Sequence, residues 1–172
     1  MRQSDLDTVK ARLAELDLEP IKFKMVKEHG CSVSEVNAIE KWYRRFLLLT
    51  FMHSAQPIVI SELMDKFWHC HILDTKKYAE DCDCVFGEFL HHFPYFGLRG
   101  EEDQAALRSA YRQTLELMRR EFGETPDEEL RVLGITATDS QLPSLCSDCA
   151  NYWRTGMMPF AHVRPRLSDL PM

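Results

Sequence analysis

Histidine, aspartate and tyrosine side chains gather in one stretch of this sequence, between residues 65 and 92. Four of the seven histidines lie there, and a buried imidazole needs a hydrogen-bond partner or a metal ion. Imidazoles and carboxylates are typical ligands of zinc, or of iron held by two histidines and one carboxylate. The sequence therefore predicts a divalent-metal site, zinc or iron being left open, with the ligands Asp65, His69, His71 and His92. Two further groups are predicted to transfer protons or to support these ligands, Tyr78 and Asp81.

The spacing of these residues along a helix decides which of them share a face. Asp65 and His69 are four residues apart, so a helix places both on one side, where they can bind one ion together. His71 lies roughly 200° around the helix from His69 and shares a face with Asp74 and Tyr78 instead. Both faces reach one site only if the segment wraps under the loop that carries the adjacent histidines at 91 and 92.

Two functions of different class fit this pattern. In the first, the chain is a small metal-dependent enzyme that acts on a small-molecule substrate, with the ion polarising the substrate or activating water. In the second, the same residues form a buried, hydrogen-bonded or metal-stapled knot in a non-catalytic helical adaptor, whose C-terminal arm binds a protein partner. We predict metal binding and leave open whether the chain is an enzyme.

The residues of this stretch also match a known family pattern. The matching runs are D-x-x-W-H-x-H from Asp65, Y-x-x-D-C from Tyr78, and G-x-x-L-x-H from Gly87 to His92. In these runs the chain resembles the plant and bacterial glycine-rich domain-containing-protein-like family (DUF1399-type), over about residues 32–125. The chain lacks the glycine-rich extension of the plant members, and His91 and Phe93 stand where an acidic residue is expected. The resemblance implies no particular reaction but one shared site, made of Asp65, His69, His71 and His92.

The cysteines predict no disulfide framework. Six cysteines in a chain of this length, with no recognisable export signal, favour reduced thiols or metal ligands. Cys82 and Cys84 form a C-x-C pair, and Cys146 and Cys149 form a C-x-x-C pair, so four thiolates can bind a second zinc ion. The pattern leaves structural zinc, an unligated reduced pair and redox chemistry open. The remaining two are expected to be small buried hydrophobic residues, Cys31 and Cys70.

Helical periodicity dominates the first 133 residues. Apolar side chains recur there at the three- to four-residue spacing of amphipathic helices. Ser32 and Glu35 have the spacing of a capping box, and Gly30 is suited to end the preceding helix. One helix is expected to run from Ser61, with a kink, toward Phe86. The sequence predicts an all-α fold, a single-domain helical bundle over residues 1–133, followed by an irregular C-terminal arm, residues 134–172, that packs on this body.

Two other groups of residues have structural interpretations. The aromatic loop from Phe93 to Phe96 is expected to plug the space between two helices, the alternative being the wall of a small-molecule pocket beside His92. Arg44 and Arg45 are expected on a solvated helix face.

Composition and charge exclude several partners. The chain has 172 residues, enough for one domain, and 27 acidic against 21 basic residues give a net charge of −6. Such a charge opposes binding to nucleic acid and to anionic membranes, and no apolar run is long enough for a transmembrane helix. Neither a glycine-rich phosphate loop nor a G-x-S-x-G nucleophile motif occurs. We expect a cytoplasmic protein whose partner is a small-molecule substrate or another protein.

Overall fold

The computed structural model describes residues 2–98, 100–132 and 168, and in these ranges the protein is all-α, as the sequence predicts. None of these helices is both long and apolar enough to cross a membrane. The predicted C-terminal arm lies outside the described residues, apart from Ser168. The helices are α1 (Gln3–Glu15), α2 (Glu19–His29), α3 (Val33–Met52), α4 (Glu62–Leu73), α5 (Thr75–Phe86), α6 (Glu101–Phe122) and α7 (Pro126–Val132).

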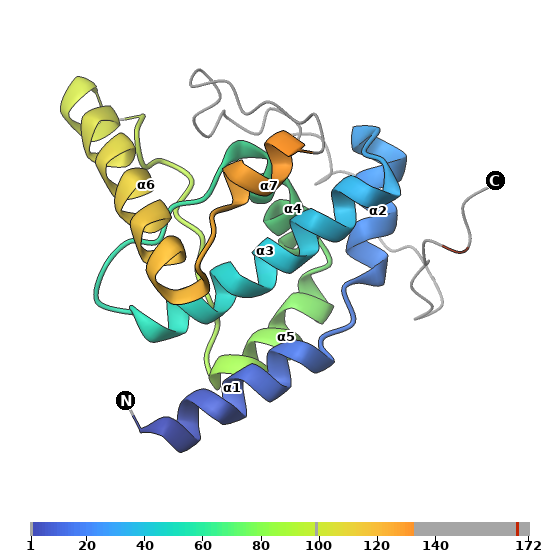
Figure 1. Cartoon of the computed structure of the whole chain (residues 1–172). Helices are drawn as coiled ribbons and strands as arrows, with labels where there is room; N and C mark the ends of the chain where they lie inside the picture. Colours follow the sequence, from blue (N-terminus) through green and yellow to red (C-terminus); the bar gives the residue numbers. More distant parts are fainter. Residues whose placement is uncertain (1, 99, 133–167, 169–172) are drawn as a thin grey trace.

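Helix α3 is the centre around which the others pack. It contacts α1, α2, α4, α6 and α7, and Figure 1 shows it running through the middle of the bundle. Its inward face carries large aromatic side chains with almost no exposed surface, Trp42, Tyr43 and Phe46. Burial of such side chains contributes roughly 1.5–3 kcal/mol each, so α3 is the main source of the apolar core that holds α4 in place.

Local signals begin and end several helices where the sequence predicts. Ser32 caps α3 in a complete capping box, in which its hydroxyl accepts from the Glu35 backbone N–H and the Glu35 carboxylate accepts from the Ser32 N–H. Gly30 ends α2 in the left-handed region at φ 70°, where a side chain is costly. Helix α2 begins at Glu19, and Pro20 fits its first turn, where the missing N–H needs no partner.

The segment from Ser61 to Phe86 forms two helices rather than one kinked helix. Asp74 ends α4 and precedes α5, with non-helical angles of φ −81° and ψ 67°. Its N–H donates to the carbonyl of His71, and its own carbonyl accepts from the N–H of Tyr78. The helical period continues through this break, so periodicity alone could not reveal it. The turn lets α5 pack back against α4.

Arg44 and Arg45 are half-buried and hold elements together, so their predicted solvated position is wrong. The Arg44 guanidinium donates to the carbonyls of Leu13 and Leu16, which end α1 and would otherwise lack partners. The Arg45 guanidinium donates to Glu124 at 2.9 Å and lies over the Trp42 ring, 4.4 Å from its centroid.

The aromatic loop between α5 and α6 is only partly a plug. Phe96 packs, half-buried, against the small cluster formed by Val59 and Leu107. Phe93 and Tyr95 are 58% and 60% exposed, and their rings contact each other 5.6 Å apart. The loop therefore presents an apolar surface to solvent immediately after His92.

Candidate functional site

Helix α4 supplies two of the predicted ligands from one face. Asp65 and His69 are one turn apart, and the Asp65 Oδ2 atom lies 3.5 Å from the His69 Nδ1 atom. The segment is held as a helix because Met64, Phe67 and other apolar side chains elsewhere around it enter the core. The i, i+4 spacing therefore places Asp65 and His69 on one face of the helix, as predicted.

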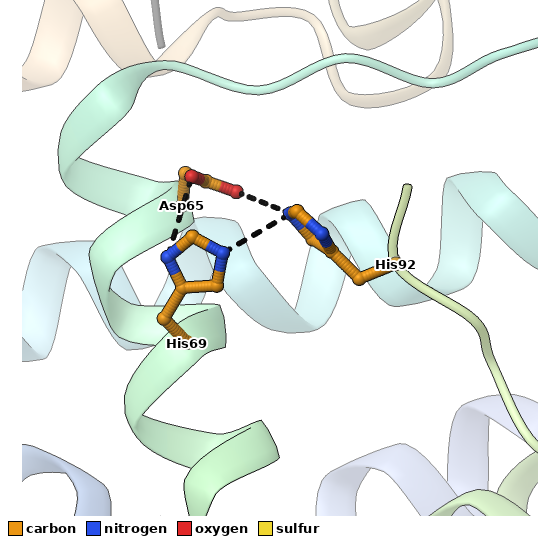
Figure 2. Close-up of side chains that lie close together, drawn as sticks. All are labelled: Asp65, His69 and His92. Atoms are coloured by element: carbon orange, nitrogen blue, oxygen red, sulfur yellow. Dashed lines mark hydrogen bonds and ion pairs between the residues drawn. The ribbon is translucent and has the colours of Figure 1, made fainter. Parts of the chain in front are cut away.

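His92 comes from the loop after α5 and completes a cluster. Its Nε2 atom lies 3.2 Å from the Asp65 Oδ1 atom and 3.2 Å from the His69 Nε2 atom (Figure 2). One potential ligand atom from each residue lies within 4.8 Å of the other two. Within the described ranges this is the one such group of histidine, cysteine and acidic side chains. We call Asp65, His69 and His92 the His/Asp cluster.

The His/Asp cluster could hold a small cation. An imidazole nitrogen has either one hydrogen or one lone pair, yet the His92 Nε2 atom faces two partners at equal distance. Metal–nitrogen bonds of about 2.0–2.1 Å at tetrahedral angles would place two ligand nitrogens about 3.3 Å apart. The observed 3.2 Å between the His69 and His92 Nε2 atoms is close to that value.

The surroundings of His69 favour its uncharged imidazole. The side chains of Asp65, His69 and His92 are 13%, 19% and 18% exposed, so the cluster is largely enclosed but reaches the surface. Burial lowers the pKa of His69, and neighbouring His92 lowers it further, while the Asp65 carboxylate acts in the opposite direction. Neutral imidazole is the form that binds a metal ion.

A hydrogen-bond chain behind the cluster fixes the position of His92. The Trp68 indole N–H donates to the Tyr78 hydroxyl at 3.0 Å, and that hydroxyl donates to the Leu90 carbonyl at 2.6 Å. The Trp68 ring also meets the His92 ring edge-on, with centroids 4.7 Å apart. Tyr78 thus holds the backbone two residues before His92. We call Trp68, Tyr78 and Leu90 the supporting chain.

Of the two roles predicted for Tyr78, proton transfer and support of the ligands, the supporting chain agrees with support. The side chain of Tyr78 is 1% exposed, and burial raises its pKa far above the ordinary range, so the hydroxyl keeps its proton and acts as a donor. This hydroxyl bonds to Trp68 and Leu90 and also interacts with the Cys82 thiol, and none of these partners belongs to the His/Asp cluster. The sequence analysis did not predict the role of Leu90, because the contact uses its backbone carbonyl. Every residue has such a carbonyl, so the residue type does not indicate the contact.

His71 belongs to a different network on another face of α4. Its Nδ1 atom lies 2.9 Å from the Tyr43 hydroxyl, and its Nε2 atom lies 2.8 Å from Asp81 Oδ2. The same Asp81 oxygen accepts from the Lys77 ammonium at 2.7 Å. Both ring nitrogens of His71 are therefore engaged, and the structure does not bring His71 or Asp81 into the His/Asp cluster. We call Tyr43, His71, Lys77 and Asp81 the His71 network.

The proton positions in the His71 network follow from its charges. Hydrogen bonds from His71 and Lys77 lower the pKa of Asp81 against the opposing effect of its burial, so the carboxylate is ionised and accepts. Burial raises the pKa of Tyr43 well above its ordinary range, so the phenol donates to Nδ1. His71 then carries its proton on Nε2 and is neutral, in agreement with the lowering of its pKa by burial.

The predicted cysteine site is only partly within the described residues. Cys82 is buried, and burial raises the pKa of its thiol, whereas Cys84 is exposed. A raised thiol pKa disfavours the thiolate that zinc requires. Cys146 and Cys149 lie outside the described residues, so the four-thiolate zinc site stays a prediction.

Comparison with known proteins places this chain in a family. A family model described as UCP032817-like matches residues 10–144, which is most of the chain and includes the whole His/Asp cluster. The chain belongs to the UCP032817-like family. Neither a curated protein nor a solved structure matches it. The UCP032817-like description carries no reaction, and the resemblance to the glycine-rich family stays a prediction.

Proposed function

We propose that this UCP032817-like chain is a metal-binding helical protein in which Asp65, His69 and His92 hold one divalent ion. The observation that carries the proposal is the convergence of one carboxylate and two imidazoles from distant parts of the chain, with both separations from the His92 Nε2 atom at 3.2 Å. Two histidines and one carboxylate suit zinc and Fe(II) alike. His71, a candidate ligand by sequence, has both nitrogens engaged elsewhere and is left out of the proposed ligand set.

The cluster supports a metal-dependent enzyme as the finer proposal. Three protein ligands leave room for water or substrate, as catalytic zinc sites and two-histidine, one-carboxylate iron sites do. A bound ion of this kind would supply Lewis acidity or an activated water. The ligand side chains are 13–19% exposed, which gives a small molecule access. The exposed Phe93 follows His92 and gives this approach an apolar side.

Metal analysis and titration test the proposal. Protein purified without a histidine tag and freed of metal with a chelator is titrated with zinc, and anaerobically with Fe(II). The Cys146→Ser/Cys149→Ser background removes the C-x-x-C pair as a competing site. We expect about one equivalent of metal, lost in His69→Ala and in His92→Ala, with the helical circular dichroism retained.

The matched control is His91→Ala, which removes an exposed imidazole next to His92. It should bind metal as the parent protein does. Full metal binding in both His69→Ala and His92→Ala would overturn the proposal, as would equal loss in His91→Ala.

A second candidate function is a non-catalytic helical adaptor that binds a protein partner. It is supported by the His71 network, in which a buried histidine has both nitrogens bonded, as a structural knot requires. If the His/Asp cluster also serves only to rigidify the fold, His92→Ala should lower the melting temperature by several degrees in chelator, because buried partners lose their bond. No metal would then bind to the parent protein.

A further inference from the structure

Two sulfur-containing side chains and one histidine lie close together where α2 packs on α4. They are separate from the His/Asp cluster. Met25 and His29 are one turn apart on α2 and so share a face. The Cys70 thiol of α4 contacts both, with its Sγ atom 3.8 Å from the Met25 Sδ atom and 3.6 Å from the His29 Nε2 atom. No motif in the sequence links these positions, because Cys70 is more than forty residues from both.

The two separations from the Cys70 sulfur are compatible with shared coordination of one ion. Metal–sulfur and metal–nitrogen bonds of about 2.3 and 2.0 Å at trigonal angles separate a sulfur from a nitrogen by about 3.7 Å, and two sulfurs by about 4.0 Å. The observed 3.6 and 3.8 Å lie within about 0.2 Å of these values.

The chemical types of the three side chains indicate which metal ion they would bind. Thiolate and thioether sulfur prefer Cu(I), whereas a thioether is absent from the usual zinc ligands. Met25 is 0% and Cys70 is 4% exposed, so the two sulfur ligands lie in an apolar environment. One thiolate neutralises a monovalent ion, whereas a divalent ion would leave a net charge in this environment, which is costly.

One of the three ligands, Cys70, borders a groove that neither Met25 nor His29 lines. This groove of about 290 Å³ lies between α2 and α4, where Cys70 lines it together with Lys24, Lys27 and Leu73. His29 is exposed at the end of α2 and can deliver an ion from solvent. We propose that Met25, His29 and Cys70 form a three-coordinate binding site for Cu(I), in which the thiol releases its proton to solvent as the copper–sulfur bond forms.

The proposal is independent of the His/Asp cluster, because the two sites share no ligand. Cu(I) affinity is measured anaerobically on the full chain, by competition with the chromophoric chelator bicinchoninate. The Cys146→Ser/Cys149→Ser background removes the two tail thiols that could compete. Copper K-edge X-ray absorption then reports the ligand atoms, for which we expect two sulfurs and one nitrogen.

Three variants remove one ligand each. Loss of a residue that merely supports a metal ligand costs about 10–100-fold in affinity, so Cys70→Ser should weaken Cu(I) binding by at least about 100-fold. Met25→Leu, which preserves volume in the core, and His29→Ala should each weaken it by at least about 10-fold. Circular dichroism checks that each variant folds, and Cys70→Ala replaces Cys70→Ser if the hydroxyl is not tolerated.

The matched control is Cys31→Ser, which changes a half-buried thiol just beyond the end of α2. It should bind Cu(I) like the parent. Unchanged affinity in folded Cys70→Ser or Cys70→Ala would overturn the proposal, and so would an absorption spectrum with only nitrogen and oxygen ligands. An equal loss of affinity in Cys31→Ser would also overturn it.

Discussion

Replacing Tyr78 by phenylalanine tests whether the supporting chain holds His92 in place. The substitution keeps the ring and removes only the hydroxyl, which accepts from the Trp68 indole at 3.0 Å and donates to the Leu90 carbonyl at 2.6 Å. Both partners then lose a bond in a region where Tyr78 is 1% exposed and Trp68 is 8% exposed.

The expected cost follows from the burial of these groups. A buried donor or acceptor left without a partner costs about 1–3 kcal/mol, so Tyr78→Phe should lower the free energy of unfolding by about 2 kcal/mol. For a chain of this size each kcal/mol corresponds to roughly 2–4 °C, which gives a fall of roughly 4–8 °C in melting temperature. Freed from Tyr78, the backbone at Leu90 no longer fixes His92, so zinc affinity should fall by about 10–100-fold.

Two measurements separate these effects. Thermal unfolding is followed by circular dichroism in chelator, so that metal does not contribute, and zinc affinity is measured at a temperature where both proteins are fully folded. Replacement of zinc by Co²⁺ adds a visible spectrum that reports the coordination geometry. A spectrum altered in Tyr78→Phe would place the disturbance at the metal rather than in the fold as a whole.

Tyr111→Phe is the matched control. Its hydroxyl also donates a hydrogen bond, to Asp127 at 3.0 Å, but in the pairing of α6 with α7. It should lower stability and leave zinc affinity unchanged. If Tyr78→Phe melts with the parent protein, or if it binds zinc as tightly, then Tyr78 does not position His92 and the reasoning is refuted.

Three further predictions concern the rest of the bundle. Burial lowers the pKa of His71 below its ordinary value of about 6.5. The stability from its neutral form is therefore complete above about pH 6.5 and is lost as pH falls through the folded pKa. An NMR titration of His71 should give a value below 6.5, and a higher one would contradict the assigned proton positions. Glu129→Ala removes the acceptor of the Trp42 indole N–H, 2.7 Å away. It should lower the free energy of unfolding by about 1–3 kcal/mol in urea titrations, and no change would show that this bond is not formed in solution. Ser32→Ala breaks the capping box with Glu35 and should cost about 1 kcal/mol, measured in the same way; a loss near zero would mean that water replaces the cap.

Helix boundaries could be predicted from the sequence where the residues that set them lie within one turn of the helix end. The capping box of Ser32 and Glu35 and the left-handed Gly30 act within one turn, and each is visible in the residue types alone. The break at Asp74 was not predictable, because the apolar period continues through it and neither glycine nor proline interrupts the segment. Arg44 was placed wrongly for a related reason, since its partners are backbone carbonyls of α1, which no sequence pattern marks.

The candidate site divides in the same way. Asp65 and His69 follow from helix geometry alone, and the contact of His92 with them was anticipated from its residue type and from the family resemblance. Whether His71 joins Asp65, His69 and His92 depended on two things. The first is its angle around α4 relative to His69, which the sequence gives. The second is whether the chain folds back so that both faces of α4 reach one site, which the sequence does not give. In the structure α5 packs on α4, and the Tyr43 hydroxyl of α3 bonds to one ring nitrogen of His71, so His71 stays apart from the His/Asp cluster.

The placement of His69 and His71 on different faces of α4 has an evolutionary consequence. Two residues of one short motif serve different parts of the structure: His69 belongs to the His/Asp cluster, which reaches the surface, and His71 belongs to the interior. Relatives can therefore lose them independently. A lineage that replaces His69 but retains His71 would preserve its architecture while discarding the cluster. A motif search that treats W-H-x-H as one set of metal ligands would wrongly count such a lineage as having the cluster. A search that requires His69 together with Asp65 and His92 would distinguish proteins that have the cluster from proteins that retain only the buried His71.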